Sequence, residues 1–215
     1  MKDTTHMLNI LDSFRFRDVD RQRLIITMDI KSLYTVIPNE GGLRALQYYL
    51  DKREILEPPT DTLLRMAELV LTLNTFEFNG EYYKQTGGVA MGSRLGPYYA
   101  CLFVGYVDER MLSSSTGIKP DLCKRYMDEL AGAASCSEED LRQFLEFASL
   151  FHPNLKYTWS VLTDELPFLD ICMKPQANRI ATSIHYKDTD SPSYLNFSSS
   201  HPYSCKSPIP VSQTE

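Results

Sequence analysis

Hydrophobic and polar residues alternate along this chain with two different periods, and the two periods mark out its predicted elements. Alternation over short runs rich in β-branched residues predicts strands, whereas apolar residues spaced three and four apart predict helices. The strand pattern is clear in "RLIITMDI", and the helical pattern is strong in "TDTLLRMAELVLTLN", which follows two prolines. By these criteria, strands are expected at 23–30, 76–83, 122–134, 155–161, 166–173 and 179–186, and helices at 39–52, 60–74, 98–112 and 137–151.

The order of these elements favours an α+β fold, with a largely antiparallel sheet and helices packed on one face. Hairpins stand next to helices along the chain, which is typical of that class. The run 76–83 turns at Asn79-Gly80, a type I′ hairpin signal, and the run 122–134 is expected to turn at its adjacent acids.

We expect one domain over residues 1–186, followed by an irregular tail over 187–215 that is rich in Ser, Pro and Tyr. The 215 residues are 43% hydrophobic and 23% charged, which is typical of a soluble protein with a sizeable core. The N-terminus lacks the apolar core of a signal peptide, and no apolar run reaches the roughly 20 residues that span a bilayer. The sequence therefore predicts an intracellular protein that is neither secreted nor inserted in a membrane.

Charge and cysteine content exclude some kinds of site. The net charge of −6, taken alone, argues against nucleic-acid binding, which usually needs a basic surface. The five cysteines are odd in number and form no C-x-x-C pair, so neither a zinc ribbon nor a disulfide framework is indicated, and free thiols are expected.

Acidic residues beside apolar strands are the candidate chemistry. Asp29 lies near the end of the strand 23–30, where a carboxylate is costly to desolvate unless it is paired or bound to a metal. Asp128, next to Glu129, lies at the turn of the second hairpin. If the two strands are neighbours, both aspartates emerge at the same end of the sheet, where their oxygens could hold Mg²⁺. Spacing alone equally permits a strand-end cap and a solvated turn, and favours that simpler interpretation.

Five stretches of the chain are informative in their order: "DIKSLYTVIP", "GGVAMGSRLGPYYACLF", "RYMDE", "LPFLDI" and "YKDTDSPSYLNFSSSHPYSCKSPIPVSQ". Together they resemble the reverse transcriptase of Penelope-like retroelements, a family related to telomerase. The resemblance runs over nearly the whole chain, from "KDTTHMLNIL" to "VSQ". It implies a right-hand polymerase palm whose fingers and thumb are largely missing.

The resemblance also implies roles for single residues around the acids. Asp29 and Asp128 match the two metal-binding catalytic aspartates, and Glu129 stands at the second acid of the Y-x-D-D box. Ile30 would offer its backbone carbonyl to the metal. Tyr34 matches the aromatic residue under the incoming sugar, where a ring crowds the 2′-hydroxyl and implies a preference for deoxynucleotides.

Two further motifs are implied to touch the substrates. Met91, Gly92 and Ser93 match the loop at the nucleotide and template base, where glycine lets the backbone come close. Phe168 and Leu169 resemble the hairpin that supports the primer end. Without the resemblance, these segments would be a helix-entry loop and a buried strand pair.

The activity implied is RNA-directed DNA synthesis by a retrotransposon enzyme in the nucleus. Its partners would be an RNA template, a DNA primer and a deoxynucleoside triphosphate, and no obligate protein partner is indicated. Two Mg²⁺ ions would assist the transfer, with Mn²⁺ as a possible substitute. The alternative is a non-catalytic, decayed or domesticated fragment that acts at most as a binding module.

Three departures from the family pattern bear on this choice. One is length, because the upstream fingers, most of the thumb and the nuclease domain of such elements are not expected within these 215 residues. Glu129 replaces an aspartate, and its extra methylene shifts the carboxylate, which can cost on the order of 10²-fold in rate. The run "LAGAA" at 130–134 replaces a strand of bulky apolar residues. We expect it to form a strand poorly and to leave unfilled volume beneath the acids, at a cost of several kcal/mol.

Overall fold

The computed structural model describes residues 1–18, 20–187 and 195–207. They fall in two units, Met1–Ile184 and His185–Glu215, and each is described by itself. The second unit contains, in its described part, the short helix α7 (Tyr203–Lys206). The elements of the first unit are α1 (Thr4–Ser13), β1 (Arg23–Ile30), α2 (Leu33–Val36), α3 (Asn39–Leu50), α4 (Thr60–Thr72), β2 (Thr75–Phe78), β3 (Glu81–Lys84), α5 (Gly96–Ser114), β4 (Leu122–Tyr126), β5 (Glu129–Ser135), α6 (Glu138–Leu150), β6 (Tyr157–Leu162), β7 (Leu166–Phe168), β8 (Ile171–Gln176) and β9 (Arg179–Ile184).

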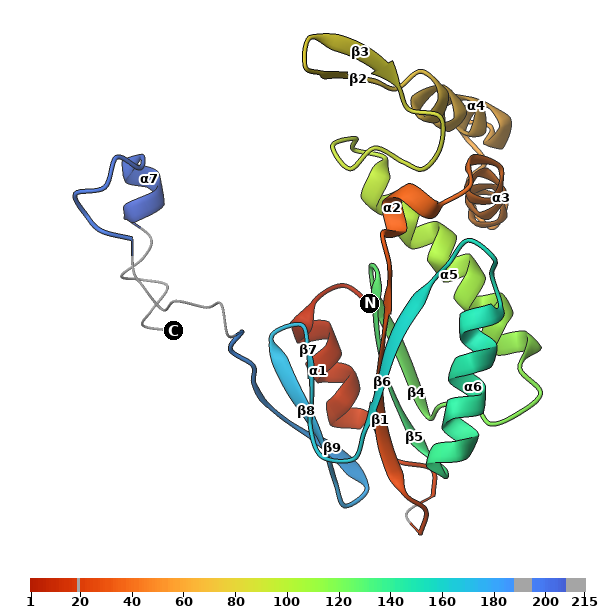
Figure 1. Ribbon diagram of the computed structural model, residues 1–215, viewed down its shortest axis with the longest axis vertical. Coiled ribbons are helices and arrows are strands. Elements are labelled where there is room, and N and C mark those ends of the chain that lie inside the picture. The colour runs from red at the N-terminus through yellow and green to blue at the C-terminus, as the bar shows by residue number, and fades with distance from the viewer. Residues whose placement is uncertain (19, 188–194, 208–215) are drawn as a thin grey trace. The chain divides into compact units, whose positions relative to one another are not determined.

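An antiparallel sheet lies at the centre of the first unit, with its strands in the order β4-β5-β1-β6 (Figure 1). β1 therefore pairs on one side with β5 and on the other with β6. The predicted hairpin at Asn79-Gly80 is confirmed as β2–β3, and β7, β8 and β9 form a separate small sheet. The α+β class and the antiparallel pairing are both confirmed.

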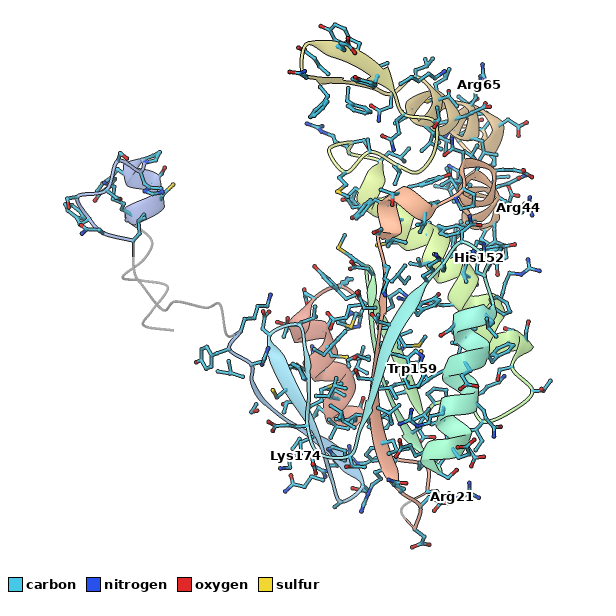
Figure 2. The ribbon with its side chains drawn as sticks, viewed as in Figure 1. Arg21, Arg44, Arg65, His152, Trp159 and Lys174 are labelled. Atoms are coloured by element: carbon cyan, nitrogen blue, oxygen red, sulfur yellow. The ribbon has the colours of Figure 1, made fainter. Side chains whose placement is uncertain are left out.

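Both faces of the central sheet are covered, which explains why β1 is apolar along most of its length. Successive side chains of a strand point to opposite faces. Leu24, Ile26 and Met28 pack with α5 and α6, whereas Ile25 packs with α1 and the small sheet (Figure 1). On the next strand, Trp159 of β6 packs against the α6 side (Figure 2). The expected helical face is thus formed by α5 and α6, and the opposite face has a cover of its own.

Helix α1 belongs to that second cover and was not predicted from the sequence. It is held at its start by Asp3, whose side chain accepts a hydrogen bond of 2.7 Å from the His6 N–H. Its buried residues are Met7 and Leu11, one pair at helical spacing. A single i, i+4 pair in a ten-residue helix gives too short a periodic signal to separate from a loop.

Helix α5 links the sheet to the cluster formed by α2, α3 and α4. Its buried side chains Tyr99, Phe103, Val107 and Met111 recur four residues apart and reach both cores. Helix α3 crosses α5 at Gly42, where a Cβ would lie 2.1 Å from the Tyr99 hydroxyl. This close crossing ties the segment after β1 to the helix that begins at the glycine-rich loop.

Strand β5 corrects the expectation for "LAGAA". It forms a complete strand, paired with β1 and with β4. Ala131 and Ala133 are 0% exposed, and a Cβ on Gly132 would lie 2.9 Å from the Ile26 side chain and 2.7 Å from the Leu122 carbonyl. Neighbouring side chains therefore fill the space that bulky residues would otherwise occupy, and pairing on both edges outweighs the low strand propensity of alanine and glycine.

Other expectations need smaller corrections. The run 166–173, which its pattern alone predicts as a strand, forms the hairpin that the resemblance implies: β7 and β8 pair across a turn in which Leu169 has a φ of +54°. The predicted tail contains α7 in its described part, whereas the run "DTDSPSY" quoted in the resemblance lies outside the described residues. None of the helices in the described parts of the chain is both long and apolar enough to cross a membrane.

Candidate active site

The end of β1 and the turn between β4 and β5 lie side by side and bring the predicted acids to one corner of the sheet. Asp29 on β1 is directly opposite Glu129 on β5. The Ile30 N–H donates a hydrogen bond of 3.2 Å to the Asp128 carbonyl. Directly opposed residues of an antiparallel pair point to the same face of the sheet. The Asp29 and Glu129 side chains therefore lie on the face that α1 covers at Ile25 and Ala133.

The turn that carries Asp128 is tight. Tyr126 pairs with Glu129, so only Met127 and Asp128 remain between the strands. Met127 has a φ of +52°, in the left-handed region that costs a residue with a side chain about 1–2 kcal/mol. Asn79, Leu169 and Ala177 have the same left-handed conformation in the turns of the other described hairpins, so it is the tightness of the turn that imposes it.

The charges at this corner influence one another. Burial raises the pKa of the Asp29 carboxyl, and the nearby Asp128 carboxylate raises it further; the Ile30 backbone hydrogen bond and the Arg125 guanidinium act in the opposite direction. Asp29 itself is exposed, at the end of a strand whose neighbouring residues Met28 and Ile30 are buried. Partial shielding by the strand end, together with a second negative charge, destabilises its ionised form.

These carboxylates fit a divalent cation only in part. Among the residues that the structure describes, three or more His, Cys, Asp or Glu side chains nowhere converge on a point that could hold a metal ion. The predicted set of Asp29, Asp128 and Glu129 is therefore not one cluster. Asp29 and Asp128 do lie within electrostatic range, and an Mg²⁺ site commonly has one or two protein carboxylates, with water and substrate phosphates as further ligands.

Tyr34 lies beside the acids on helix α2 and is fixed by the glycine-rich loop. The Tyr34 carbonyl accepts a hydrogen bond of 2.8 Å from the Val89 N–H. Gly88 makes this approach possible: its φ is +72°, and a Cβ there would lie 2.6 Å from the same carbonyl. Burial raises the pKa of the Tyr34 hydroxyl, and Cys101 and the Asp128 carboxylate raise it further, so the hydroxyl lies within electrostatic range of Asp128.

The predicted nucleotide loop divides into exposed and structural residues. Met91 and Gly92 are exposed, whereas Ser93 is half-buried at the entry to α5. The Ser93 hydroxyl donates to the Ala90 carbonyl at 2.9 Å and accepts from the Gly96 N–H at 3.0 Å. Ser93 therefore has a helix-entry role of its own, and the nucleotide contact implied for this loop remains a prediction.

Of the two primer-support candidates, only Leu169 is available for contact. Phe168 is 1% exposed and lies in the core beneath the sheet. Leu169 is half-buried at the turn between β7 and β8. Asp170, the next residue, is exposed and accepts a hydrogen bond of 3.0 Å from the Thr4 hydroxyl.

Sequence reasoning did not identify an ion pair next to the turn between β4 and β5. Arg125 on β4 donates to the two carboxylate oxygens of Asp108 on α5, at 2.6 and 3.0 Å. The Arg125 side chain is 9% exposed and that of Asp108 is 15% exposed. The only signal in the sequence is that charged residues interrupt the apolar runs "LCKRYM" and "GYVDERML". The partners could not be matched without knowing that the strand and the helix are adjacent.

Comparisons with known proteins bear on the fold. No family model and no curated protein matches the chain. Among solved structures, the telomerase of Candida tropicalis in complex with a fragment of telomeric RNA is similar, with a TM-score of 0.67 and 10% identity over 91% of this chain and 35% of that one. The telomerase of Candida albicans, also with telomeric RNA, has a TM-score of 0.64 and 10% identity over 85% of this chain and 34% of that one.

A viral enzyme shows the same likeness. The RNA-dependent RNA polymerase of a human picobirnavirus has a TM-score of 0.56 and 14% identity over 78% of this chain and 31% of that one. This chain therefore spans about a third of the length of these neighbours. Identities this low carry no residue roles across, but the shared sheet and helices do establish the architecture. The chain has the α+β palm fold of nucleic-acid polymerases, in the form also found in telomerase and viral RNA polymerases.

Proposed function

We propose that this chain is the palm of a reverse transcriptase, similar to those of Penelope-like retroelements, which extends a DNA primer on an RNA template. The observation that carries the proposal is the meeting of Asp29 and Asp128 at one corner of a polymerase-like sheet, within range of each other's charge. Two carboxylates held together at a strand end and a tight turn are suited to binding the divalent cations that assist phosphoryl transfer.

Each group at the corner would have a distinct part. Asp29 and Asp128 would hold the two Mg²⁺ ions that the resemblance implies, or Mn²⁺, with Glu129 assisting and the Ile30 carbonyl as a further oxygen. Bound there, such a cation would activate the primer 3′-hydroxyl and neutralise charge on the triphosphate. Tyr34 would stack under the sugar and disfavour a 2′-hydroxyl, so deoxynucleotides are the proposed substrates.

The glycine-rich loop would complete the nucleotide site. The hydrogen bond from the Val89 N–H to the Tyr34 carbonyl supports this role. It joins the loop that carries the exposed residues Met91 and Gly92 to the backbone of Tyr34. The RNA in the telomerase neighbours belongs to those proteins, and an RNA template is part of the proposal for this one. The net charge of −6 implies that much of the affinity for nucleic acid would come from outside this chain.

One of the departures that supported the non-catalytic alternative is removed by the structure. The small-residue strand, which was expected to weaken the site, is closely packed and paired on both edges. Glu129 remains as the departure that would reduce the rate.

Extension of oligo(dT) on poly(rA) with Mg²⁺ or Mn²⁺ tests the proposal. We expect incorporation of dTTP by the chain, more with Glu129→Asp and none with Asp29→Asn or Asp128→Asn. Asp164→Asn, an exposed acid after the far end of β6, is the matched control and keeps full activity. Absence of extension by both the chain and Glu129→Asp would favour the binding module.

A further inference from the structure

We propose that Arg125 and Asp108 are a positioning pair that holds the Asp128 turn against the end of β1. The proposal rests on the proposed function, because it assigns the pair to the metal-binding corner. Neither side chain is placed at the substrate, so both would act through the backbone of Asp128.

The guanidinium of Arg125 joins separate parts of the chain. Its Nε and one terminal nitrogen form the bidentate contact with Asp108 on α5. Its other terminal nitrogen, Nη1, donates to the Asp128 carbonyl at 2.9 Å. The same carbonyl accepts the Ile30 N–H at 3.2 Å. One buried side chain thus connects α5, β4, the turn and the end of β1.

This contact addresses the weakness of the turn. Met127 is in the left-handed region, so the two-residue turn needs outside support to keep its shape. The support is given to Asp128 itself, since two donors converge on its carbonyl. With the carbonyl fixed, the backbone from which the Asp128 carboxylate projects is fixed as well.

The burial of the pair distinguishes it from the other ion pairs of the described residues. In each of those, at least one side chain is 46% or more exposed, whereas Arg125 and Asp108 are 9% and 15% exposed. Two well-packed apolar side chains are often as stabilising as a buried ion pair. An apolar pair could not donate a hydrogen bond to Asp128, and that donation is what the charged pair adds.

The planar fork of arginine also matters. Arginine can satisfy a carboxylate with two nitrogens and still present a third to a carbonyl, whereas a lysine ammonium is a point charge that cannot reproduce both contacts in the same geometry. Arg125→Lys therefore keeps the charge that compensates Asp108 but weakens the support of the turn.

The test measures Mn²⁺ binding to the full chain by electron paramagnetic resonance. The site of interest is the one that is present in the wild-type chain and absent in Asp128→Asn. The main variant is Arg125→Met with Asp108→Leu, which removes both charges together and leaves neither unpaired. We expect the Mn²⁺ dissociation constant to rise about tenfold in this double variant and about threefold in Arg125→Lys. Arg65→Gln with Glu68→Gln, a surface pair on α4 (Figure 2), is the control and leaves it unchanged.

Amide hydrogen exchange provides a readout that needs no metal. In the double variant, the Ile30 N–H is expected to exchange at least tenfold faster, because the carbonyl that accepts it is less well held. The Ile26 N–H, in the centre of the sheet opposite Gly132 and Val161, keeps its rate and shows that the fold is intact.

The outcomes separate the two proposals. A folded double variant with wild-type Mn²⁺ affinity and wild-type exchange at Ile30 would overturn the positioning role, and the same criterion applies to Arg125→Lys if the double variant fails to fold. A wild-type chain without an Asp128-dependent Mn²⁺ site would overturn the proposed function, and the exchange of Ile30 would still decide whether the pair supports the turn.

Discussion

At the scale of the residue, the ionised Asp29 carboxylate destabilises the folded protein, and the effect can be measured as a dependence of stability on pH. Burial and the neighbouring Asp128 both disfavour its ionised form, so the pKa of its carboxyl is raised in the folded protein above the usual 3.8. The folded state then holds the Asp29 proton more tightly than the unfolded state does. Stability is therefore lost as the pH rises from 3.8 through the raised pKa, and it stays lower above it.

Asp29→Asn should remove this loss. Because Asp29 is exposed to solvent, screening limits the gain at pH 7 to less than about 1 kcal/mol, and the gain should vanish below pH 3.8. Urea unfolding of the chain and the variant between pH 3.5 and 7.5 measures it. Asp164→Asn is the control, and identical pH profiles for the chain and Asp29→Asn would contradict the electrostatic account.

Gly88 is the second residue with a sharp prediction. Gly88→Ala would place a Cβ 2.6 Å from the Tyr34 carbonyl, at a φ of +72°, so we expect a loss of about 2–3 kcal/mol in the free energy of unfolding. Gly87→Ala, whose Cβ would meet nothing within 4 Å, should change it by less than about 0.5 kcal/mol. Equal destabilisation by the two variants would show that the contact with Tyr34 does not hold the loop.

Sequence alone identified the residues whose type carries their chemistry. Asp29 and Asp128 could be found because each follows an apolar strand, and the end of β1 does lie beside the turn. The exposure of Asp29 and the burial of Phe168 depend on what covers each side of the strand, which no local pattern contains. The ion pair between Arg125 and Asp108 joins two elements that are separate in the sequence, so the sequence pattern could not reveal it either.

At the scale of the element, strand β5 shows how packing overrides composition. Its alanines and its glycine are poor strand formers, yet the strand is flanked by β1 and β4 and buried on both faces. Small side chains let the Ile26 side chain lie directly over Gly132. Side chains of neighbouring strands fill the space beside the small residues of β5. The pattern of one strand alone cannot reveal this compensation.

Restoring a bulky residue in β5 should therefore destabilise the protein. Gly132→Val would force a Cβ to within 2.7 Å of the Leu122 carbonyl and 2.9 Å of Ile26, and we expect a loss of about 1–3 kcal/mol. Gly117→Val, in a loop position with nothing within 4 Å, is the control. A stabilising effect of Gly132→Val in thermal unfolding would restore the expectation of a cavity.

The element predictions succeeded where the periodic signal was long. Helices α4 and α6 and strand β1 were predicted within a few residues, since each combines a clear period with a start or stop signal. In α6, the Ser137 hydroxyl accepts a hydrogen bond of 3.1 Å from the Asp140 N–H and so caps the start of the helix. Helix α1 was missed because one buried pair of residues sets no period.

At the scale of the whole molecule, the order of elements predicted the architecture better than any local pattern. Hairpins interspersed with helices indicated the α+β class, and the palm fold follows from the likeness to polymerases at 9–14% identity. The acidic net charge of −6 gave the opposite indication about nucleic acid. The two indications are compatible under the proposed function if the acids of the site lie in this chain and the basic surface that holds nucleic acid is supplied from elsewhere.

The central claim is that Asp29 and Asp128 form one metal-binding corner, and paramagnetic broadening by Mn²⁺ in the ¹⁵N-labelled chain tests it most directly. Substoichiometric Mn²⁺ is predicted to broaden the amide signals of Asp29, Ile30 and Asp128 first, and to leave that of Asp164 sharp. Asp128→Asn should abolish this selectivity. Broadening spread evenly over the acidic surface, or centred on another group of carboxylates, would contradict the account.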